Sequence, residues 1–328
     1  MEKLYRIEKD FLGEKRIELN KYYGIQTLRA KENFNITKTD ISLFPNFIKS
    51  LAKVKKACAL TNFELGDLTD IQKDAIVQAC NEIIDGKFHD QFIVDPIQGG
   101  AGTSTNMNAN EVIANRALEI LGHPKSSYNI IHPNNHINMS QSTNDVYPTA
   151  IKLTLHELIY KLKDALRFLR DCFEEKAIEF KDVLKMGRTQ LQDAVPMTLG
   201  QEFKTFAVMI DDDIYRLRNV QALLKEINLG ATAIGTGINT KAAYQRKVIS
   251  NLREVTGVDY ISAGDLIEAT QDTGSFVHIS GMLKSIAIKV SKICNDLRLL
   301  SSGPRAGFNE INLPPMQPGS SIMPGKVN

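Results

Sequence analysis

The sequence predicts a mainly all-α protein, in which long helices form a bundle and a smaller, mixed helical domain precedes them. The first observation is that apolar residues from Phe276 to Leu300 recur at alternating spacings of three and four. The second is that Ile151–Cys172 and Leu199–Leu217 carry similar stripes. The third is that no run alternates strand and helix patterns. Sustained heptad seams are typical of helices packed lengthwise in a bundle, which argues against a doubly wound sheet.

Shorter helices are predicted in the first part of the chain. Their apolar patterns cover Phe47–Asn62, Ile71–Ile84 and Asn108–Leu121. Pro45 precedes the first pattern, and Gly86 and Gly122 follow the other two, as expected at helix starts and ends. Between the second and third helices, Asp95–Asn106 is rich in glycine, so we expect a loop there.

The change of pattern near residue 140 divides the chain into an N-terminal domain, residues 1–139, and a helical-bundle domain, residues 140–328. The long helices are apolar on more than one side, so they need more than one neighbour. The flanking apolar residues are Ile159, Phe168, Val208, Ile288 and Leu299. A larger core within the chain or other subunits would cover them, and the pattern favours other subunits. Because the sequence stops at Val327-Asn328, inside a polar loop, we expect the C-terminal part of the bundle domain to be missing.

Composition excludes several classes of function. The 328 residues include 40 Lys and Arg against 38 Asp and Glu, so the chain lacks the charge of a nucleic-acid or acidic-membrane partner. No apolar run approaches the length of a membrane span, and the charged N-terminus has no signal core, so we expect a cytoplasmic protein with no membrane partner. The scattered cysteines are predicted to be reduced core thiols; they are Cys58, Cys80, Cys172 and Cys294.

Three patterns resemble binding motifs but lack their essential parts. Gly99–Asn106 has no Lys-Ser/Thr pair after a second glycine, so it is not a nucleoside-triphosphate loop. Gly230–Gly237 lacks the third glycine of a dinucleotide fingerprint and follows no predicted strand. His132 and His136 have metal-ligand spacing, but Pro133 and two asparagines between them predict a turn with surface or capping histidines. We therefore expect no metal site.

Three short polar segments concentrate hydroxyl and amide groups. They are Gly102–Asn106, Ser140–Asp145 and Gly319–Asn328, and the third adds the cation of Lys326. Singly, each is typical of a helix cap or a turn. Together they provide the donors that a socket for a small dianion needs. The glycines at 319 and 325, which frame Ser320 and Ser321, suit a mobile lid.

In the third segment, the string Gly-Ser-Ser-Ile-Met-Pro-Gly-Lys-Val-Asn resembles the signature of the fumarase/aspartase superfamily. The resemblance extends over nearly the whole chain, through Tyr22–Thr27, Asn106–Asn108 and Gly187–Thr189. Three places resemble its aspartate ammonia-lyase branch more than fumarases. Thr143 stands where fumarases usually carry a second serine, Gln190 stands where they carry histidine, and Leu28–Ala30 follows Gln26-Thr27 in the lyase manner.

The resemblance implies the reversible anti elimination of ammonia from L-aspartate, a small dicarboxylate, to give fumarate through an aci-carboxylate intermediate. It also implies a homotetramer whose long helices form a central bundle, with each active site assembled from three subunits. No cofactor is implied, because the substrate's own carboxylate takes up the electrons.

The same resemblance implies roles for ten residues. Ser320 matches the base. The donors to the aci-carboxylate are matched by Thr103, Ser142, Thr143 and Ser321. Lys326 and Asn328 match the residues that hold the α-carboxylate. Asn144, Thr189 and Gln190 line the amine side. Fumarases commonly have His-Pro-Asn-Asp at a carboxylate-binding turn, but here it reads His132-Pro133-Asn134-Asn135, so this turn receives no role.

Two other functions stay open at this point. The first is fumarase, which hydrates fumarate in the same kind of socket. Gln190 argues against it, because proton transfer to water needs a titratable group such as histidine. The second is a truncated, catalytically silent assembly partner. The missing part of the bundle favours that reading, and the intact Ser320, Lys326 and Asn328 oppose it.

Overall fold

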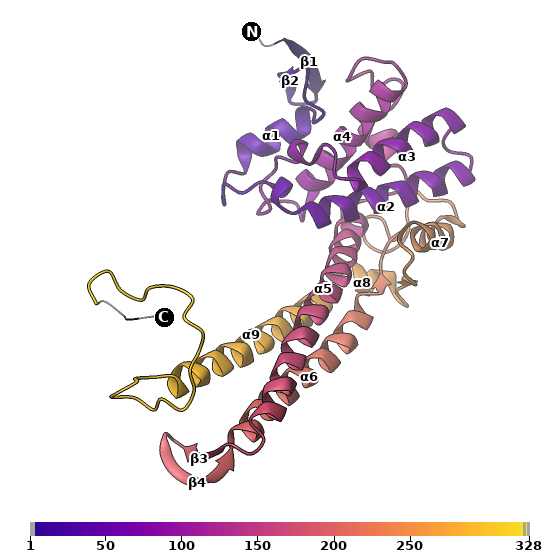
Figure 1. Ribbon diagram of the computed structural model, residues 1–328. Coiled ribbons are helices and arrows are strands. Elements are labelled where there is room, and N and C mark those ends of the chain that lie inside the picture. Colours follow the sequence, from indigo (N-terminus) through magenta and orange to yellow (C-terminus); the bar gives the residue numbers. More distant parts are fainter. Residues whose placement is uncertain (1–3, 324–325, 327–328) are drawn as a thin grey trace. The chain divides into compact units, whose positions relative to one another are not determined.

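The computed structural model describes residues 4–323 and 326, and its chain is mainly helical (Figure 1). The strands are β1 (Tyr5–Asp10), β2 (Gly13–Glu18), β3 (Leu184–Thr189), β4 (Gln192–Thr198), β5 (Glu226–Ile227) and β6 (Ile261–Ser262). The α-helices are α1 (Ile25–Asn33), α2 (Pro45–Glu64), α3 (Asp70–Ile84), α4 (Thr103–Ile120), α5 (Thr143–Glu179), α6 (Leu199–Leu223), α7 (Tyr244–Thr256), α8 (Leu266–Gln271) and α9 (Gly274–Leu300). Short turns of helix are η1 (Ile41–Leu43), η2 (His89–Gln91) and η3 (Pro133–Ile137). These elements form two compact units.

The first unit comprises Met1–Leu158 and Gln221–Ser275. Its core lies where α2 packs against α3 and α7, and where α3 packs against α4. The fully buried side chains there include Leu51 of α2, Ile76 of α3, Ile113 of α4 and Leu252 of α7. Because these helices are apolar on the faces that meet, the unit has its own hydrophobic core.

The second unit comprises Ile159–Val220 and Phe276–Asn328, and therefore most of the three longest helices. Four aromatic rings pack at centroid distances between 5.5 and 6.2 Å: Phe173, Phe180, Phe203 and Phe206. The antiparallel hairpin of β3 and β4 joins α5 to α6 (Figure 1). Among the described residues, no helix is long and apolar enough to cross a membrane.

The predicted helices are confirmed, with one correction to a loop. The three short patterns lie in α2, α3 and α4, and the three long seams lie in α5, α6 and α9. The predicted loop over Asp95–Asn106 is wrong in its last four residues, because α4 already begins at Thr103. Gly102, with a φ of 93°, ends the glycine-rich run, and the polar residues after it are compatible with a first helical turn.

The burial of α9 shows how much of its seam one chain covers. Ile279, Ile286, Ile293 and Leu300 are buried, as the seam predicts. Leu283, between the first two, is 41 % exposed. The other seam residues, Phe276, Val290 and Leu297, are partly buried, so the described chain buries every second heptad position and covers the positions between them only in part.

The compact units do not coincide with the predicted boundary between residues 139 and 140. The reason is that α5, α6 and α9 each begin in one unit and end in the other, so contacts divide the helices themselves. The two units are defined by contacts in the structure, whereas the two predicted domains are defined by the sequence pattern, so one does not test the other. The division into residues 1–139 and 140–328 stays a prediction.

Candidate active site

Thr103 is the first residue of α4, and the backbone before it is tightly packed. Gly102 has a φ of 93°, and a Cβ atom there would lie 2.4 Å from the ring of Tyr147. Only glycine combines that dihedral with such a close approach. The exposed Thr103 hydroxyl donates to the carbonyl oxygen of Gly100 at 2.6 Å. Gly102 thus fixes where the helix starts and where Thr103 lies.

Ser142, Thr143 and Asn144 form the start of α5. The Ser142 hydroxyl accepts the backbone N–H of Asn144 at 3.2 Å, and Asp145 accepts the backbone N–H of Ser142 at 2.9 Å. This reciprocal arrangement caps the helix in the manner of a capping box. The Asn144 side-chain amide donates to the carbonyl oxygen of Ala233 at 2.7 Å. The helix cap therefore presents the three predicted side chains together.

The starts of α4 and α5 are joined by an asparagine. The buried Asn106 donates from Nδ2 to Thr143 Oγ1 at 3.3 Å and to Asn138 Oδ1 at 3.0 Å. Asn106 lies one turn after Thr103 on the same helix. Two helix N-termini, each with a positive dipole end, therefore lie close together in the first unit, and such ends favour negative charge nearby.

Asp145 holds the start of α5 against a loop 85 residues further along the chain. Its buried carboxylate accepts the backbone N–H groups of Gly230 at 3.0 Å and Thr232 at 3.1 Å. Burial raises the pKa of Asp145 to about 6, although these amides and the charge of Lys55 oppose the rise. The glycine-rich run at 230–237 resembles a nucleotide motif in sequence, but in the structure its backbone N–H groups hold the Asp145 carboxylate.

Lys55, on α2, is a buried cation beside the same segment. Its ammonium group donates to Asn138 Oδ1 at 2.9 Å and to Gln141 Oε1 at 2.8 Å. Burial lowers the pKa of Lys55 to about 8. Lys55, Asn138 and Asp145 were not predicted as site residues. Lys55 and Asn138 carry no motif, and the only signal for Asp145 was its place at the end of the second polar segment.

Thr189 and Gln190 lie at the tip of the β3–β4 hairpin in the second unit. Thr189 pairs with Gln192, so Gln190 and Leu191 form a two-residue turn. Both turn residues have positive φ, 48° and 64°. The Thr189 and Gln190 side chains are exposed. The sequence did not predict this hairpin, because its turn lacks the Asn-Gly or Gly-Gly pair that marks such turns.

Ser320 accepts two backbone amides within its own segment. Its Oγ lies 3.2 Å from the amide nitrogen of Ile322 and 3.1 Å from that of Met323. The backbone of Lys326 closes the segment, because its carbonyl accepts from Gly319 at 2.9 Å. Ser321 and the Lys326 side chain are exposed. The predicted Asn328 lies outside the described residues.

The predicted site residues divide between the two units. The first unit holds Thr103, Ser142, Thr143 and Asn144, and the second holds Thr189, Gln190, Ser320, Ser321 and Lys326. Within the first unit, the structure brings the α4 and α5 starts together through Asn106.

The turn with two histidines is held by its own hydrogen bonds. His132 Nδ1 accepts the backbone N–H groups of Asn134 at 3.0 Å and Asn135 at 3.3 Å. His136 Nδ1 accepts the backbone N–H of His132 at 2.8 Å. This confirms the expected capping histidines. In the part of the chain that the structure describes, no three His, Cys, Asp or Glu side chains are grouped to hold a metal ion.

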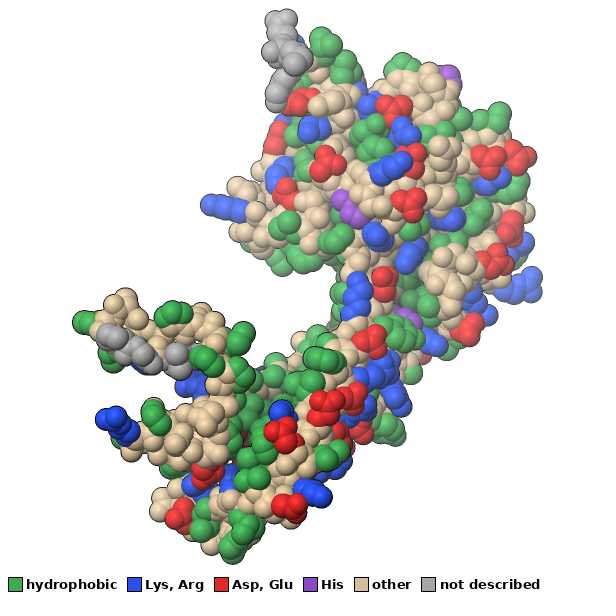
Figure 2. All heavy atoms as spheres, viewed as in Figure 1, with side chains coloured by type: hydrophobic (Ala, Val, Ile, Leu, Met, Phe, Trp, Pro, Cys, Tyr) green, Lys and Arg blue, Asp and Glu red, His purple; other side chains and the backbone are tan. Residues whose placement is uncertain are grey.

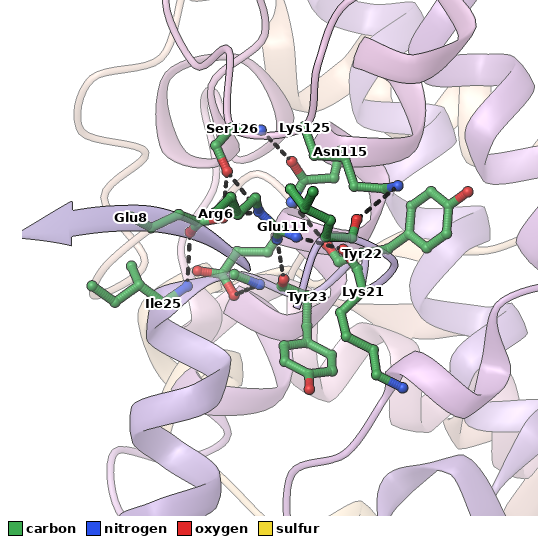
Figure 3. Close-up of polar contacts among 12 residues, drawn as sticks. Arg6, Glu8, Lys21, Tyr22, Tyr23, Ile25, Glu111, Asn115, Lys125 and Ser126 are labelled. Carbon is green, nitrogen blue, oxygen red and sulfur yellow. Dashed lines mark hydrogen bonds and ion pairs between the residues drawn. The ribbon is translucent and has the colours of Figure 1, made fainter. Parts of the chain in front are cut away.

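A second buried group of charges lies at the start of α1 (Figure 3). Glu111 accepts the backbone N–H groups of Gly24 at 2.8 Å and Thr27 at 3.1 Å. Glu8 accepts the backbone N–H of Ile25 at 2.9 Å and pairs with Arg6 at 2.9 Å. Two carboxylates thus cap one helix. No polar motif in the sequence pointed to this cluster.

Comparison with known proteins places the chain in a family of enzymes. A family model described as Lyase matches residues 13–328, so the chain belongs to that lyase family. It is 61% identical over 323 residues to aspartate ammonia-lyase of Helicobacter pylori strain 26695, which covers 98% of this chain and 69% of that protein. It is 55% identical over 324 residues to aspartate ammonia-lyase of Escherichia coli K12, which covers 98% of this chain and 68% of that protein.

Solved structures show the same fold. A fumarate lyase:delta crystallin from Brucella melitensis superposes with a TM-score of 0.97 at 56% identity, over 99% of this chain and 71% of that one. A class II fumarase from Schistosoma mansoni gives a TM-score of 0.94 at 36% identity, over 99% and 71% of the two chains. The all-α lyase fold is therefore confirmed.

Proposed function

We propose that this protein is a carbon–nitrogen lyase that eliminates ammonia from L-aspartate reversibly to give fumarate. The main support for this proposal is the 61% identity to an aspartate ammonia-lyase over nearly the whole chain. The substrate is a small dicarboxylate, and the difficult step is removal of a proton from the carbon beside its β-carboxylate. The carbanion delocalises into that carboxylate, so the enzyme must direct donors at both of its oxygens.

The donors are proposed to be Thr103, Ser142, Thr143 and Ser321. The convergence of two helix starts in the first unit supports this assignment for the first three. The positive dipole ends of the two helices favour negative charge near these hydroxyl groups. Asn106 and Asp145 fix those helix starts, so the donors need no rearrangement as the aci-carboxylate forms.

Ser320 is proposed as the base that removes the proton. A free serine hydroxyl is a poor base, so its oxyanion must be stabilised where it forms. The two backbone amides at 3.2 and 3.1 Å from Ser320 Oγ support the role, because they solvate that oxygen without water. Lys326 and Asn328 are proposed to hold the α-carboxylate, and Asn144, Thr189 and Gln190 to line the amine side. The electrons go to the substrate's own carboxylate, so the elimination requires no cofactor.

Fumarase is the second candidate, and two observations disfavour it. The class II fumarase that matches is 36% identical, against 55 to 61% for the aspartate ammonia-lyases. A hydroxyl must also be protonated to leave, and Gln190 has no transferable proton. An amine leaves without that help, because it already carries a positive charge.

We also propose that the active form is a homotetramer in which three subunits share each active site. Its support is the apolar surface of the second unit, where hydrophobic side chains lie open among the helices (Figure 2). Phe168 is 73 % exposed, Val208 49 % and Ile288 58 %, whereas Ile159 is buried and Leu299 is 36 % exposed. Exposed apolar side chains that gather on one set of helices are typical of a surface that contacts another protein.

A cytoplasmic location is proposed for the enzyme. All four cysteines lie in the described chain and are free, which suits a reducing compartment. The expectation that they are core thiols holds for Cys58 and Cys80, is wrong for Cys294, which is exposed, and holds only in part for Cys172.

Absorbance in the fumarate band tests the proposed reaction. Wild-type protein should form fumarate from L-aspartate and should not form it from L-malate at a comparable kcat/KM. Gln190→His should raise the malate rate, because it adds a titratable donor at the leaving-group side. If the wild type dehydrates malate as fast as it deaminates aspartate, the enzyme is a fumarase.

A further inference from the structure

The segment after α9 folds back on the end of that helix and reaches the β3–β4 hairpin. The backbone N–H of Asn309 donates to the carbonyl of Ser302 at 2.9 Å, and that of Glu310 donates to the carbonyl of Leu300 at 2.9 Å. Residues 302–310 thus form a closed loop within the second unit. The backbone of Glu310 is hydrogen-bonded to the end of α9, and its side chain is free to contact the β3–β4 hairpin.

Glu310 binds two cations of strand β3. One carboxylate oxygen accepts a hydrogen bond from Arg188, and the other lies 3.3 Å from Lys185 Nζ. Lys185 also pairs with Glu202 at the start of α6. The side chains of Arg188 and Glu310 are each 18% exposed, and that of Lys185 is 8% exposed. Ion pairs that are shielded from water and share partners contribute more to stability than isolated surface pairs.

The same loop holds Arg188 in a second way. Its guanidinium carbon lies 4.2 Å from the ring centroid of Phe308. Burial opposes ionisation of Glu310, but the hydrogen bond from Arg188 and the nearby ammonium group of Lys185 hold its pKa below the usual 4.5. The carboxylate is therefore charged at neutral pH. Arg188 therefore contacts a ring and a carboxylate that come from one short loop.

The turn next to Arg188 needs support from outside the hairpin. Gln190 and Leu191 both adopt left-handed backbone conformations, which cost non-glycine residues on the order of 1 kcal/mol each. A register irregularity between Met186 and Arg188 also interrupts the ladder. Irregularities of this kind redirect a side chain, and here the redirected side chain is the one that Glu310 holds.

We propose that Glu310 is a positioning residue for the amine-side turn, Thr189 and Gln190. It acts through Arg188, which directly precedes Thr189, and it ties this turn to the chain segment that leads to Ser320 ten residues later. The inference rests on the proposed function, because it assumes that this turn contacts the amine of aspartate. Loss of the Glu310 carboxylate should therefore affect the binding of ammonia more than the binding of fumarate.

The test measures the reverse reaction of the full-length protein, with ammonium and fumarate varied separately. Glu310→Gln keeps the side-chain shape and removes the charge. We expect its KM for ammonium to rise about fivefold or more and its KM for fumarate to stay within about twofold, as follows from losing one positioned contact. Trypsin should also cleave after the exposed Arg305 several times faster, because the loop opens more often.

Glu179→Gln is the matched control. Glu179 is a glutamate of the same unit with its own lysine partner, Lys176, and its side chain is 53% exposed. It should leave both KM values and the trypsin rate unchanged. If Glu310→Gln does not assemble, Arg188→Lys takes its place, because lysine keeps the charge but not the planar stacking on Phe308.

An unchanged KM for ammonium in the assembled variant would overturn the inference. Equal increases in both KM values would overturn it as well, because they indicate a general structural role. A wild-type enzyme that is inactive in both directions would instead refute the proposed function, so the two failures are distinguishable.

Discussion

The carboxyl group of Glu111 is buried at the start of α1, close to the second carboxylate of Glu8 (Figure 3). Burial raises the pKa of Glu111 to about 7, and the charge of Glu8 adds to the rise, against hydrogen bonds from Thr27 and Gln26. The unfolded chain has the ordinary value of 4.5. Between these two values the folded protein binds more protons than the unfolded chain, so the stability that Glu111 contributes is lost as pH rises through about 7.

Glu111→Gln should remove this pH dependence. Urea midpoints of wild type and variant at pH 5 and pH 8, at one protein concentration, measure it. At pH 5 the variant should be less stable than wild type, because a neutral amide accepts fewer hydrogen bonds. By pH 8 this difference in the free energy of unfolding should be smaller, by an amount on the order of 3 kcal/mol or less. Glu254→Gln, at an exposed carboxyl group of the same unit, is the control. A gap that stays constant would contradict the assignment.

The sequence motifs predict candidate site residues but not the residues that hold them. Ser142, Thr143 and Ser320 were found because they lie in short polar motifs. Lys55 lies in an apolar helix pattern, and Glu310 lies in a segment with no motif. Their roles depend on contacts with residues 83 and 122 positions away in the chain. Such contacts follow from tertiary packing, which local patterns do not contain.

At the scale of elements, heptad seams predicted the long helices but not the hairpins. The seams of α5, α6 and α9 are regular because each helix packs along its length. The β3–β4 strands are short, and they are joined by Gln190 and Leu191 instead of glycine or asparagine. Tertiary contacts, including those of Arg188, override the turn preference there.

A buried ion pair fixes α6 against α9. The Asp213 side chain is fully buried and pairs with Lys289 and, at 3.1 Å, with Arg216. Lys289→Met removes one partner from a buried carboxylate, which should lower the free energy of unfolding by about 2 kcal/mol or more. Thermal melts of wild type and variant measure the loss.

Lys292→Met is the control for that pair. Lys292 lies on the same helix, and its side chain is 58% exposed in its pair with Asp296. An exposed pair of this kind should cost less than about 1 kcal/mol. Equal melting temperatures for Lys289→Met and wild type would show that the buried pair does not stabilise the bundle.

At the scale of the whole molecule, the half-covered seam of α9 predicts self-association. Light scattering of the full-length protein at micromolar concentration should give four times the mass of one chain, because the open apolar faces are buried between subunits. Ile288→Glu places a charge on one of these faces and should dissociate the assembly. A wild-type monomer would contradict the tetramer and, with it, the sharing of active sites.

The proposed reaction depends on Ser320 as the base that removes the proton from L-aspartate. Fumarate formation by Ser320→Ala, measured against wild type in the same assembled state, tests this role. Because only one half-exposed hydroxyl is lost, the fold should be unchanged while the rate falls about 100-fold or more, the usual contribution of a general base. A variant that keeps more than about a tenth of the wild-type rate would contradict the assignment of Ser320 as the base.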